Sequence, residues 1–334
     1  MSGLGASIDE LAASTGFSGV VRVDRGDESV FAGAYGLAHR GLGIANSVDT
    51  RFGIASGTKG ITAATVMTLV ETGELELATP ARSLLREDLP LIDERVTIEH
   101  LLSHRSGIGD YFDEEAIQDP TEYVMPVPVH LLAGSEDYLR VLGGHEQVFA
   151  PGERFAYNNS GFVVLALIAE RASGTPFELL VRERVCEPAG MRDTAFLRSD
   201  EPAGNTALGY LAADGLRTNV LHLPVLGSGD GGLHSTAADV RAFWLALFSG
   251  RIVGSDHVDE MVRPRSEVST DSRRYGLGMW LHVTGNAVLL EGYDAGVSFR
   301  TVHDPDGPLT YTLLSNTTDG AWPIAGRLDE LLAS

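Results

Sequence analysis

Lysine is almost absent from this chain of 334 residues: 24 of its 25 basic residues are arginine, and Lys59 is the single exception. Arginine keeps its proton under ordinary conditions, whereas a partly buried lysine amine can lose one and act as a base. Lys59 is therefore a candidate for a chemical role, against the alternative of a chance surface lysine. The residues around it, described below, favour the chemical role.

Cysteine and long apolar runs are also scarce. The only cysteine, Cys186, cannot form a disulfide within the chain, which suits a reducing compartment. Its neighbours include no obvious base, so a buried structural thiol is favoured over a nucleophile. The longest apolar run, residues 162–169, is far too short to cross a bilayer, and residues 1–17 lack the regions of a signal peptide. We therefore expect a cytoplasmic protein without a membrane partner.

Positive charge is in short supply, because the formal net charge is −21. A nucleic-acid phosphate backbone would be repelled, so we expect no nucleic-acid partner. The charge is spread along the chain, which is typical of a solubilising surface. The chain is long enough for one large domain or two ordinary ones, and its composition is that of a globular protein. Nothing in the sequence fixes the oligomeric state.

Motifs of several other enzyme classes are missing. No Gly-x-Ser-x-Gly string occurs, so the usual nucleophile elbow of α/β-hydrolases is excluded. The histidines form no His-Glu-x-x-His, so we expect no metal, and the acidic run Asp113-Glu114-Glu115 is more typical of a solvated loop. Residues 227–232 match Gly-x-Gly-x-x-Gly, but the segment before them contains Pro224 and makes a poor central parallel strand. We interpret these glycines as allowing close packing or a turn beside the active site, and expect no cofactor.

The order of predicted elements indicates an α+β fold. Strands are predicted at residues 18–23, 29–35, 275–283, 287–290, 297–303 and 309–314. Helices are predicted at residues 56–73, 162–171, 236–248 and 324–332. Strands at both ends suggest an antiparallel sheet flanked by helices, in a discontinuous domain of residues 1–75 and 235–334. Residues 76–234 would then form an inserted, mainly helical domain, which we expect to be all-helical, with the active site in the cleft between the two.

Ser56-Gly57-Thr58-Lys59 opens the first long predicted helix. A spacing of three places the serine hydroxyl and the lysine amine on one helical face, and the helix N-terminus supplies positive potential. Serine is a weak nucleophile without a base, and a neutral lysine amine can serve if burial lowers its pKa. Ser56 could also act only as a helix N-cap, a role compatible with catalysis. In Tyr157-Asn158-Asn159, the phenol could relay a proton and the Asn159 amide could hold a substrate carbonyl.

These motifs belong to a longer series. In order along the chain it reads Thr50-Arg51-Phe52-Gly53-Ile54-Ala55-Ser56-Gly57-Thr58-Lys59, Leu101-Leu102-Ser103-His104-Arg105-Ser106-Gly107, Pro151-Gly152-Glu153-Arg154-Phe155-Ala156-Tyr157-Asn158-Asn159, Glu187-Pro188-Ala189-Gly190-Met191-Arg192-Asp193-Thr194, Gly231-Gly232-Leu233-His234-Ser235-Thr236 and Tyr275-Gly276-Leu277-Gly278. The series, which spans about residues 18–316, resembles the serine β-lactamase-like family. That family includes penicillin-binding proteins, class C β-lactamases, D-alanyl-D-alanine carboxypeptidases, D-aminopeptidases and esterases.

The resemblance implies a β-lactamase/transpeptidase-like fold and an acyl-enzyme mechanism. Ser56 would attack the substrate, and water would then hydrolyse the resulting ester. Lys59 and Tyr157 would handle protons, and which of them acts as base in each step stays open. Asn159 would orient the substrate, and the backbone amides of Ser56 and Tyr293 would form the oxyanion hole.

The third motif of the family departs from its usual form in this chain. Members carry Lys-Thr-Gly or His-x-Gly where this sequence has Leu290-Glu291-Gly292. Leucine would remove a cation that engages a substrate carboxylate, while Gly292 and Tyr293 would still contact the substrate. Glu291 would point to the other side of the strand and is given no role.

We therefore expect a small-molecule ester or amide substrate without a strict need for a carboxylate, and rank esterase ahead of peptidase. A D-alanyl-D-alanine carboxypeptidase or β-lactamase is the alternative within the family. A catalytically inactive ligand-binding protein on the same scaffold is the alternative of another class.

Overall fold

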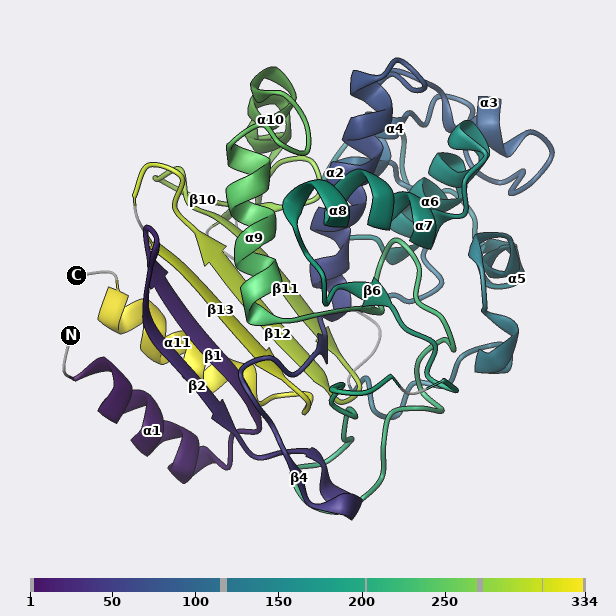
Figure 1. Cartoon of the computed structure of the whole chain (residues 1–334). Helices are drawn as coiled ribbons and strands as arrows, with labels where there is room; N and C mark the ends of the chain where they lie inside the picture. Colours follow the sequence, from purple (N-terminus) through teal and green to yellow (C-terminus); the bar gives the residue numbers. More distant parts are fainter. Residues whose placement is uncertain (1–2, 115–118, 202, 269–272, 308, 333–334) are drawn as a thin grey trace.

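A single antiparallel sheet dominates the computed structural model, which describes residues 3–114, 119–201, 203–268, 273–307 and 309–332. Within these residues its strand order is β2-β1-β13-β12-β11-β10-β9-β8 (Figure 1). The strands are β1 (Gly19–Arg25), β2 (Glu28–Tyr35), β8 (Ser266–Val268), β9 (Arg273–Tyr275), β10 (Trp280–His282), β11 (Val288–Asp294), β12 (Val297–His303) and β13 (Leu309–Ser315). Because β1 pairs with β13, the two ends of the chain build one sheet, as the sequence predicted.

Helices cover both faces of this sheet (Figure 1). The helices of the described residues are α1 (Leu4–Thr15), α2 (Thr58–Glu71), α3 (Ala81–Leu85), α4 (Ile98–Leu102), α5 (Leu139–Leu142), α6 (Asn159–Ser173), α7 (Phe177–Val181), α8 (Glu187–Ala189), α9 (Ala237–Phe248), α10 (Ser255–Val262) and α11 (Ala321–Leu332). Neighbouring residues of β1 face opposite layers, since side chains alternate along a strand. Val21 packs with α1 and α11, whereas Val20 belongs to the larger core that contains α2 and α9.

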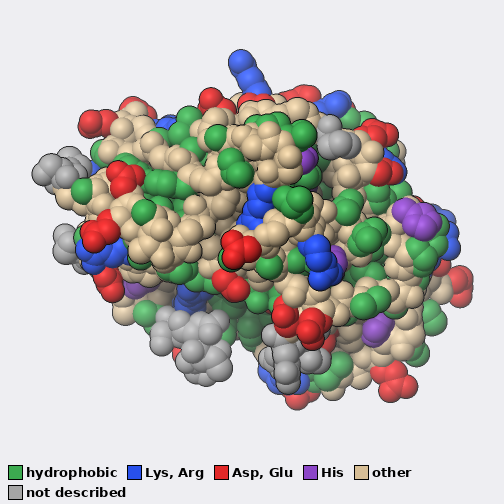
Figure 2. All heavy atoms as spheres, turned by 90° about the horizontal axis from the view of Figure 1, so that it is seen from below, with side chains coloured by type: hydrophobic (Ala, Val, Ile, Leu, Met, Phe, Trp, Pro, Cys, Tyr) green, Lys and Arg blue, Asp and Glu red, His purple; other side chains and the backbone are tan. Residues whose placement is uncertain are grey.

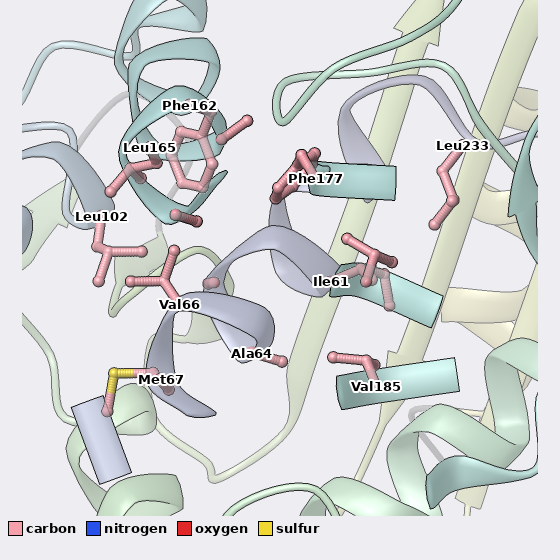
Figure 3. Packing of buried hydrophobic residues seen from close by; sticks show 14 of the residues in the cluster. Ile61, Ala64, Val66, Met67, Leu102, Phe162, Leu165, Phe177, Val185 and Leu233 are labelled. Atoms are coloured by element: carbon pink, nitrogen blue, oxygen red, sulfur yellow. The ribbon is translucent and has the colours of Figure 1, made fainter. Parts of the chain in front are cut away.

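Helix α2 lies at the centre of the larger core, and its residues from Thr58 to Leu69 are buried on all sides. Figure 3 shows Val66 beside Leu102 and Leu165, while Ile61 on the other side of the helix lies near Phe177. Each fully buried aliphatic side chain of this kind stabilises the fold by about 1.5–3 kcal/mol. A helix packed from every direction is a rigid support for the residues at its N-terminus.

One predicted strand is wrong in the structure. Instead of one strand over residues 275–283, the chain ends β9 at Tyr275, turns, and forms β10 at Trp280–His282, and the two strands pair antiparallel. The turn contains Gly278 with φ of +76°, where a Cβ would lie 2.2 Å from the Cβ of Ala63 on α2. Only glycine fits this close approach, so the chain reverses against α2 instead of continuing straight.

The middle of the chain is helical with one small addition. Strand β6 (Ala195–Phe196) pairs with β7 (Leu233–Ser235), which also pairs with β5 (Phe52–Gly53). This small sheet connects the middle segment to the residues just before Ser56. The prediction that residues 76–234 are all-helical is therefore wrong at β6 and at the start of β7. The domain boundaries near residues 75 and 235 stay predictions.

The surface charge is dispersed on the face seen in Figure 2, where acidic, basic and apolar side chains are interspersed. This mixture agrees with the spread of charge along the sequence. Among the residues that the structure describes, no helix has both the length and the apolar character needed to cross a membrane.

Candidate active site

Ser56 lies on a short 3-10 turn, η2 (Ala55–Gly57), that runs directly into α2. The turn is tight, because Ala55 adopts a left-handed backbone conformation with φ of +42°. Gly57 is required beside it, since a Cβ there would lie 2.3 Å from the ring of Phe299 on β12. The geometry holds the serine hydroxyl at the N-terminal end of a buried helix, where positive potential is greatest.

The amine of Lys59 is surrounded by oxygen atoms. Its Nζ donates to Ser56 Oγ at 2.8 Å, to Asn159 Oδ1 at 2.7 Å and to the backbone carbonyl of Asp230 at 2.9 Å. The Lys59 side chain is buried, with only 2% of its surface exposed. Three acceptors match the three hydrogens of an ammonium group, so the amine has a fixed position and orientation.

Burial lowers the pKa of Lys59 below its ordinary value. The carboxylates of Asp230, Glu114, Asp110 and Asp294 act in the opposite direction, but desolvation is the larger effect. The Lys59 amine therefore loses its proton at a lower pH than a lysine in water does. In its neutral form Lys59 can accept a hydrogen bond from the Ser56 hydroxyl and take its proton.

Tyr157 and Ser56 line the same cleft, and an interaction with the Ser56 side chain acts to lower the pKa of the Tyr157 phenol. The Lys59 amine is 4.9 Å from the centre of the Tyr157 ring. The ring stacks on Trp280 with a centroid distance of 6.2 Å. Burial raises the pKa of Tyr157 well above its ordinary value, so the phenol carries its proton at neutral pH.

Asn159 starts α6 and points its amide at Lys59. Its Nδ2 donates to the Phe112 carbonyl at 2.8 Å and to Glu114 Oε1 at 3.1 Å, so both amide hydrogens are used within the protein. The predicted role of orienting a substrate would require one of these bonds to break. Asp110 in turn accepts the backbone N–H of Asn159 at 2.7 Å and fixes this end of the helix.

Strand β11 runs directly against the turn that carries Ser56. A Cβ on Gly292 would lie 2.1 Å from the carbonyl oxygen of Ile54, so only glycine permits this contact. Tyr293 follows with its side chain exposed and its ring 6.2 Å from that of Trp322. The backbone of β11 and the N-terminal end of α2 thus face the same space, which is the arrangement that an oxyanion hole requires.

These groups open into a cleft of about 810 Å³. Its walls are formed by Ser56, Gly107, Ile108, Asp110, Asp113, Glu114, Val148, Phe149, Arg154, Phe155, Ala156, Tyr157, Asn158, Glu267, Val268, Trp280, Glu291, Gly292, Tyr293 and Trp322. Acidic side chains outnumber basic ones among them. The acidic run predicted as a solvated loop therefore borders the cleft at Asp113 and Glu114, while Glu115 lies outside the described residues.

Comparison with known proteins agrees with this geometry. The family model described as Beta-lactamase matches residues 4–333. The chain belongs to the β-lactamase family. It is a serine hydrolase of that family with a β-lactamase/transpeptidase-like fold, as the resemblance implied.

Three members of the β-lactamase family show how far the likeness extends. The chain is 27% identical over 316 residues to the putative penicillin-binding protein PbpX of Bacillus subtilis. The matched region covers 94% of this chain and 74% of PbpX. It is 36% identical over 187 residues to esterase EstB of Burkholderia gladioli, covering 54% of this chain and 47% of EstB. The crystal structure of a penicillin-binding protein from Bacillus halodurans matches with a TM-score of 0.91 at 34% identity, over 97% of this chain and 99% of that one.

In the third β-lactamase-family motif, the residues that face the cleft differ from those that the sequence suggested. Leu290 belongs to the core and packs over Gly60 of α2, and it does not border the cleft. Glu291 does point the other way, as alternation predicts, and that side borders the cleft. Its carboxylate pairs with Arg273 and with Arg300, the latter at 3.2 Å.

Several site residues were not singled out from the sequence. The backbone carbonyl of Asp230 accepts from Lys59, and its carboxylate accepts from the Tyr111 hydroxyl at 2.6 Å. Burial, with Glu114 and Asp230 nearby, raises the pKa of Asp294 to about 7. Asp230 lies in the glycine-rich segment 227–232, whose interpretation as close packing beside the active site is confirmed: a Cβ at Gly229 would lie 2.1 Å from a carbonyl oxygen of α6.

Metal ligation finds no support in the part of the chain that the structure describes. None of its histidine, cysteine and acidic side chains form a group of three or more that could hold an ion. Of the carboxylates that line the cleft, Asp110 and Glu114 act on the pKa of Lys59.

Proposed function

We propose that the protein hydrolyses small carboxylic esters through a covalent ester on Ser56. Lys59 would act as the base that activates Ser56, and Tyr157 would carry the proton to the leaving group. The observation that carries this proposal is the buried Lys59 amine, held 2.8 Å from Ser56 Oγ by two further acceptors. A lysine placed for charge alone would not need burial, which lowers its pKa.

The steps follow from these positions. Ser56 Oγ attacks the ester carbonyl carbon while its proton moves to the neutral Lys59 amine. The negative charge that develops on the carbonyl oxygen faces the backbone amides of Ser56 and Tyr293. Collapse of this intermediate expels the alcohol, which receives the proton from Lys59 through the Tyr157 hydroxyl. Water then attacks the acyl group, and the same residues return the proton to Ser56.

We assign Asn159 to Lys59 and not to the substrate. Its oxygen accepts from the amine at 2.7 Å, and its two amide hydrogens donate to Phe112 and Glu114. Gly292 lets β11 approach the serine, and Tyr293 contributes its backbone amide, so both contact the substrate carbonyl region. This division of roles needs no metal and no cofactor.

The charge of the cleft supports an uncharged or cationic substrate. Asp110, Asp113, Glu114 and Glu267 line it, whereas Arg154 is the basic side chain on its wall. A substrate carboxylate would be repelled by this lining. β-Lactams and peptidoglycan stem peptides both present a carboxylate, so β-lactamase and D-alanyl-D-alanine carboxypeptidase activities rank behind ester and amide hydrolysis. The 36% identity to esterase EstB supports placing esters first.

The test of the nucleophile is hydrolysis of 4-nitrophenyl acetate, with intact-mass detection of an acetyl adduct. Wild type should turn over the ester and show the adduct, and Ser56→Ala should lose both. Ser173→Ala is the matched control, because its hydroxyl donates to the Ala169 carbonyl and accepts the Thr175 N–H at the far end of α6 from Asn159. Turnover that persists in Ser56→Ala would refute the assignment. Absence of both turnover and adduct in the wild type would favour a ligand-binding protein on the same scaffold.

The test of substrate charge compares phenyl acetate with 3-carboxyphenyl acetate. The reacting ester is the same, so the ratio of kcat/KM reports the effect of the added carboxylate. We expect the uncharged ester to be preferred by about tenfold or more, because one misplaced charge in a partly buried site costs over 1 kcal/mol. Preference for the carboxylate, or rapid hydrolysis of nitrocefin, would move the proposal to a penicillin-recognising activity.

We further propose that the enzyme acts in the cytoplasm on small molecules, without nucleic-acid or membrane partners. The support is the net charge of −21 and the single cysteine, whose thiol is buried. Fractionation of cells that express the native protein would test the location.

A further inference from the structure

His104 holds the chain on both sides of Tyr157. Its backbone carbonyl accepts the N–H of Ala156 at 2.9 Å, and its ring Nδ1 accepts the N–H of Asn158 at 3.1 Å. One residue therefore fixes the residue before and the residue after the tyrosine. The loop that presents His104 follows α4, and His104 adopts φ of +54°, a left-handed conformation that ordinary side chains rarely take.

The His104 ring also contacts the Tyr157 ring directly. The two ring centroids are 4.3 Å apart, and the rings of Phe162 and Tyr275 lie 5.0 and 4.8 Å away on other sides. His104 is buried, with 1% of its surface exposed. Packed in this way, the imidazole limits how far the phenol can move relative to Ser56.

The hydrogen bond to Asn158 decides the protonation state of His104. Nδ1 must be unprotonated to accept, so the proton lies on Nε2, which has no partner among the described residues. The charged and titratable groups that face the ring are Lys59, Tyr157 and Tyr275. Burial, together with the positive charge of Lys59, lowers the pKa of His104 well below its ordinary value.

We propose that His104 is a positioning residue for Tyr157, which it holds at Ser56 through the Asn158 and Ala156 contacts and through its ring. The inference rests on the proposed function, because it assigns to His104 an effect on the proton transfer that Tyr157 performs. His104 does not touch the substrate or the reacting atoms. An unpaired buried N–H is a cost that packing alone does not require, since an aliphatic side chain would fill the same space without a polar atom.

Two substitutions of similar shape separate positioning from packing. Asparagine places its Oδ1 two bonds beyond Cβ, as histidine places Nδ1, and it tolerates φ above zero. Leucine has the same branching but no acceptor. His104→Asn should therefore keep the hydrogen bond to Asn158, and His104→Leu should lose it.

We expect His104→Leu to lower kcat for 4-nitrophenyl acetate by tenfold to on the order of a hundredfold, with KM nearly unchanged, because a displaced proton donor slows chemistry and not binding. His104→Asn should recover most of this loss. In a Tyr157→Phe background, His104→Leu should cost little more, since the group it positions is gone. Thermal unfolding of each variant accompanies the kinetics.

His303 supplies the matched control. It is a buried histidine whose ring bonds to Thr310 Oγ1 at 2.8 Å and stacks on Trp244, away from the cleft. His303→Leu should lower the unfolding temperature and leave kcat within a few-fold of wild type.

The outcomes separate the two proposals. An active wild type with His104→Leu equally active, or with an effect that is fully additive to Tyr157→Phe, overturns the role of His104 and leaves the proposed function in place. A folded wild type without turnover or adduct overturns the proposed function and this inference with it. A loss of kcat in His104→Leu that His104→Asn rescues and Tyr157→Phe absorbs supports both.

Discussion

Replacing Lys59 by methionine removes a buried ammonium while preserving the length and much of the volume of the side chain. Three acceptors lose their donor: Ser56 Oγ, Asn159 Oδ1 and the Asp230 carbonyl. At about 0.5–1.5 kcal/mol each, the three lost hydrogen bonds cost about 1.5–4.5 kcal/mol of folding free energy. The buried charge carries an opposing desolvation penalty of several kcal/mol, which methionine relieves. The two effects nearly cancel, so we expect the free energy of unfolding to stay within about 2 kcal/mol of wild type.

Catalysis has no such compensation. A positioned general base contributes about 10²–10⁴-fold to a proton transfer, which corresponds to about 3–5 kcal/mol in the barrier. Lys59→Met should therefore slow formation of the Ser56 ester by this factor while the protein stays folded. The rate of the 4-nitrophenol burst measures acylation, and urea denaturation measures stability.

A control on the same helix is available in Thr62→Val, which removes the hydrogen bond from Thr62 Oγ1 to the Gly229 carbonyl. This variant should lose some stability and keep its acylation rate within a few-fold. Acylation in Lys59→Met at more than about a tenth of the wild-type rate would refute Lys59 as the base. A loss of more than about 4 kcal/mol in stability would refute the estimate that desolvation offsets the lost bonds.

Three further predictions concern pH, the oxyanion strand and the thiol. The Asp230 carboxylate raises the pKa of Lys59, so Asp230→Asn should lower it. Because the reaction needs the neutral amine, kcat/KM rises with pH, and the midpoint of this rise should move to lower pH in the variant. An unmoved midpoint would contradict the coupling between Asp230 and Lys59. Gly292→Ala places a methyl group against the Ile54 carbonyl and should slow acylation on the order of a hundredfold; an unchanged rate would remove β11 from the oxyanion hole. Burial raises the pKa of Cys186 to about 12, so iodoacetamide at pH 8 should label it, by mass, only after denaturation; rapid labelling of the folded protein would disprove this.

The sequence predicted helices and strands best where the spacing of apolar residues along a short segment determines the element. Strands β1, β12 and β13 and helices α6 and α9 lie close to their predicted positions, because alternation and helical spacing are visible within a few residues. The pairing of Ser56 with Lys59 was predictable for the same reason, since three residues apart on a helix is a fixed distance. Tyr157 required the family resemblance, because nothing local connects residue 157 with residue 56.

Contacts between distant segments were not predictable. The turn at Gly278 exists because α2 lies against it, and no pattern in residues 275–283 records that neighbour. Leu290 was interpreted by its place in a motif, yet its side chain packs in the core, in the space left by the missing side chain of Gly60. Asp230 reaches Lys59 through a backbone carbonyl, which carries no side-chain signal at all. His104 was visible only as part of a motif, and its contacts with Ala156 and Asn158 follow from the folded loop.

The pairing of β1 with β13 has a consequence for the order of events during synthesis. Gly19 lies opposite Ser315 and Arg25 opposite Leu309, so β1 cannot form these pairs until β13 has been synthesised. Strand β11, which approaches Ser56, is joined to β1 only through β12 and β13. Ser56 and Lys59 are synthesised before β11, β12 and β13. Until β12 and β13 have been added, β11 has no sheet that positions it against Ser56. Contacts of such long sequence separation form slowly, and the nascent chain completes its hydrolytic centre only after β13 has been synthesised.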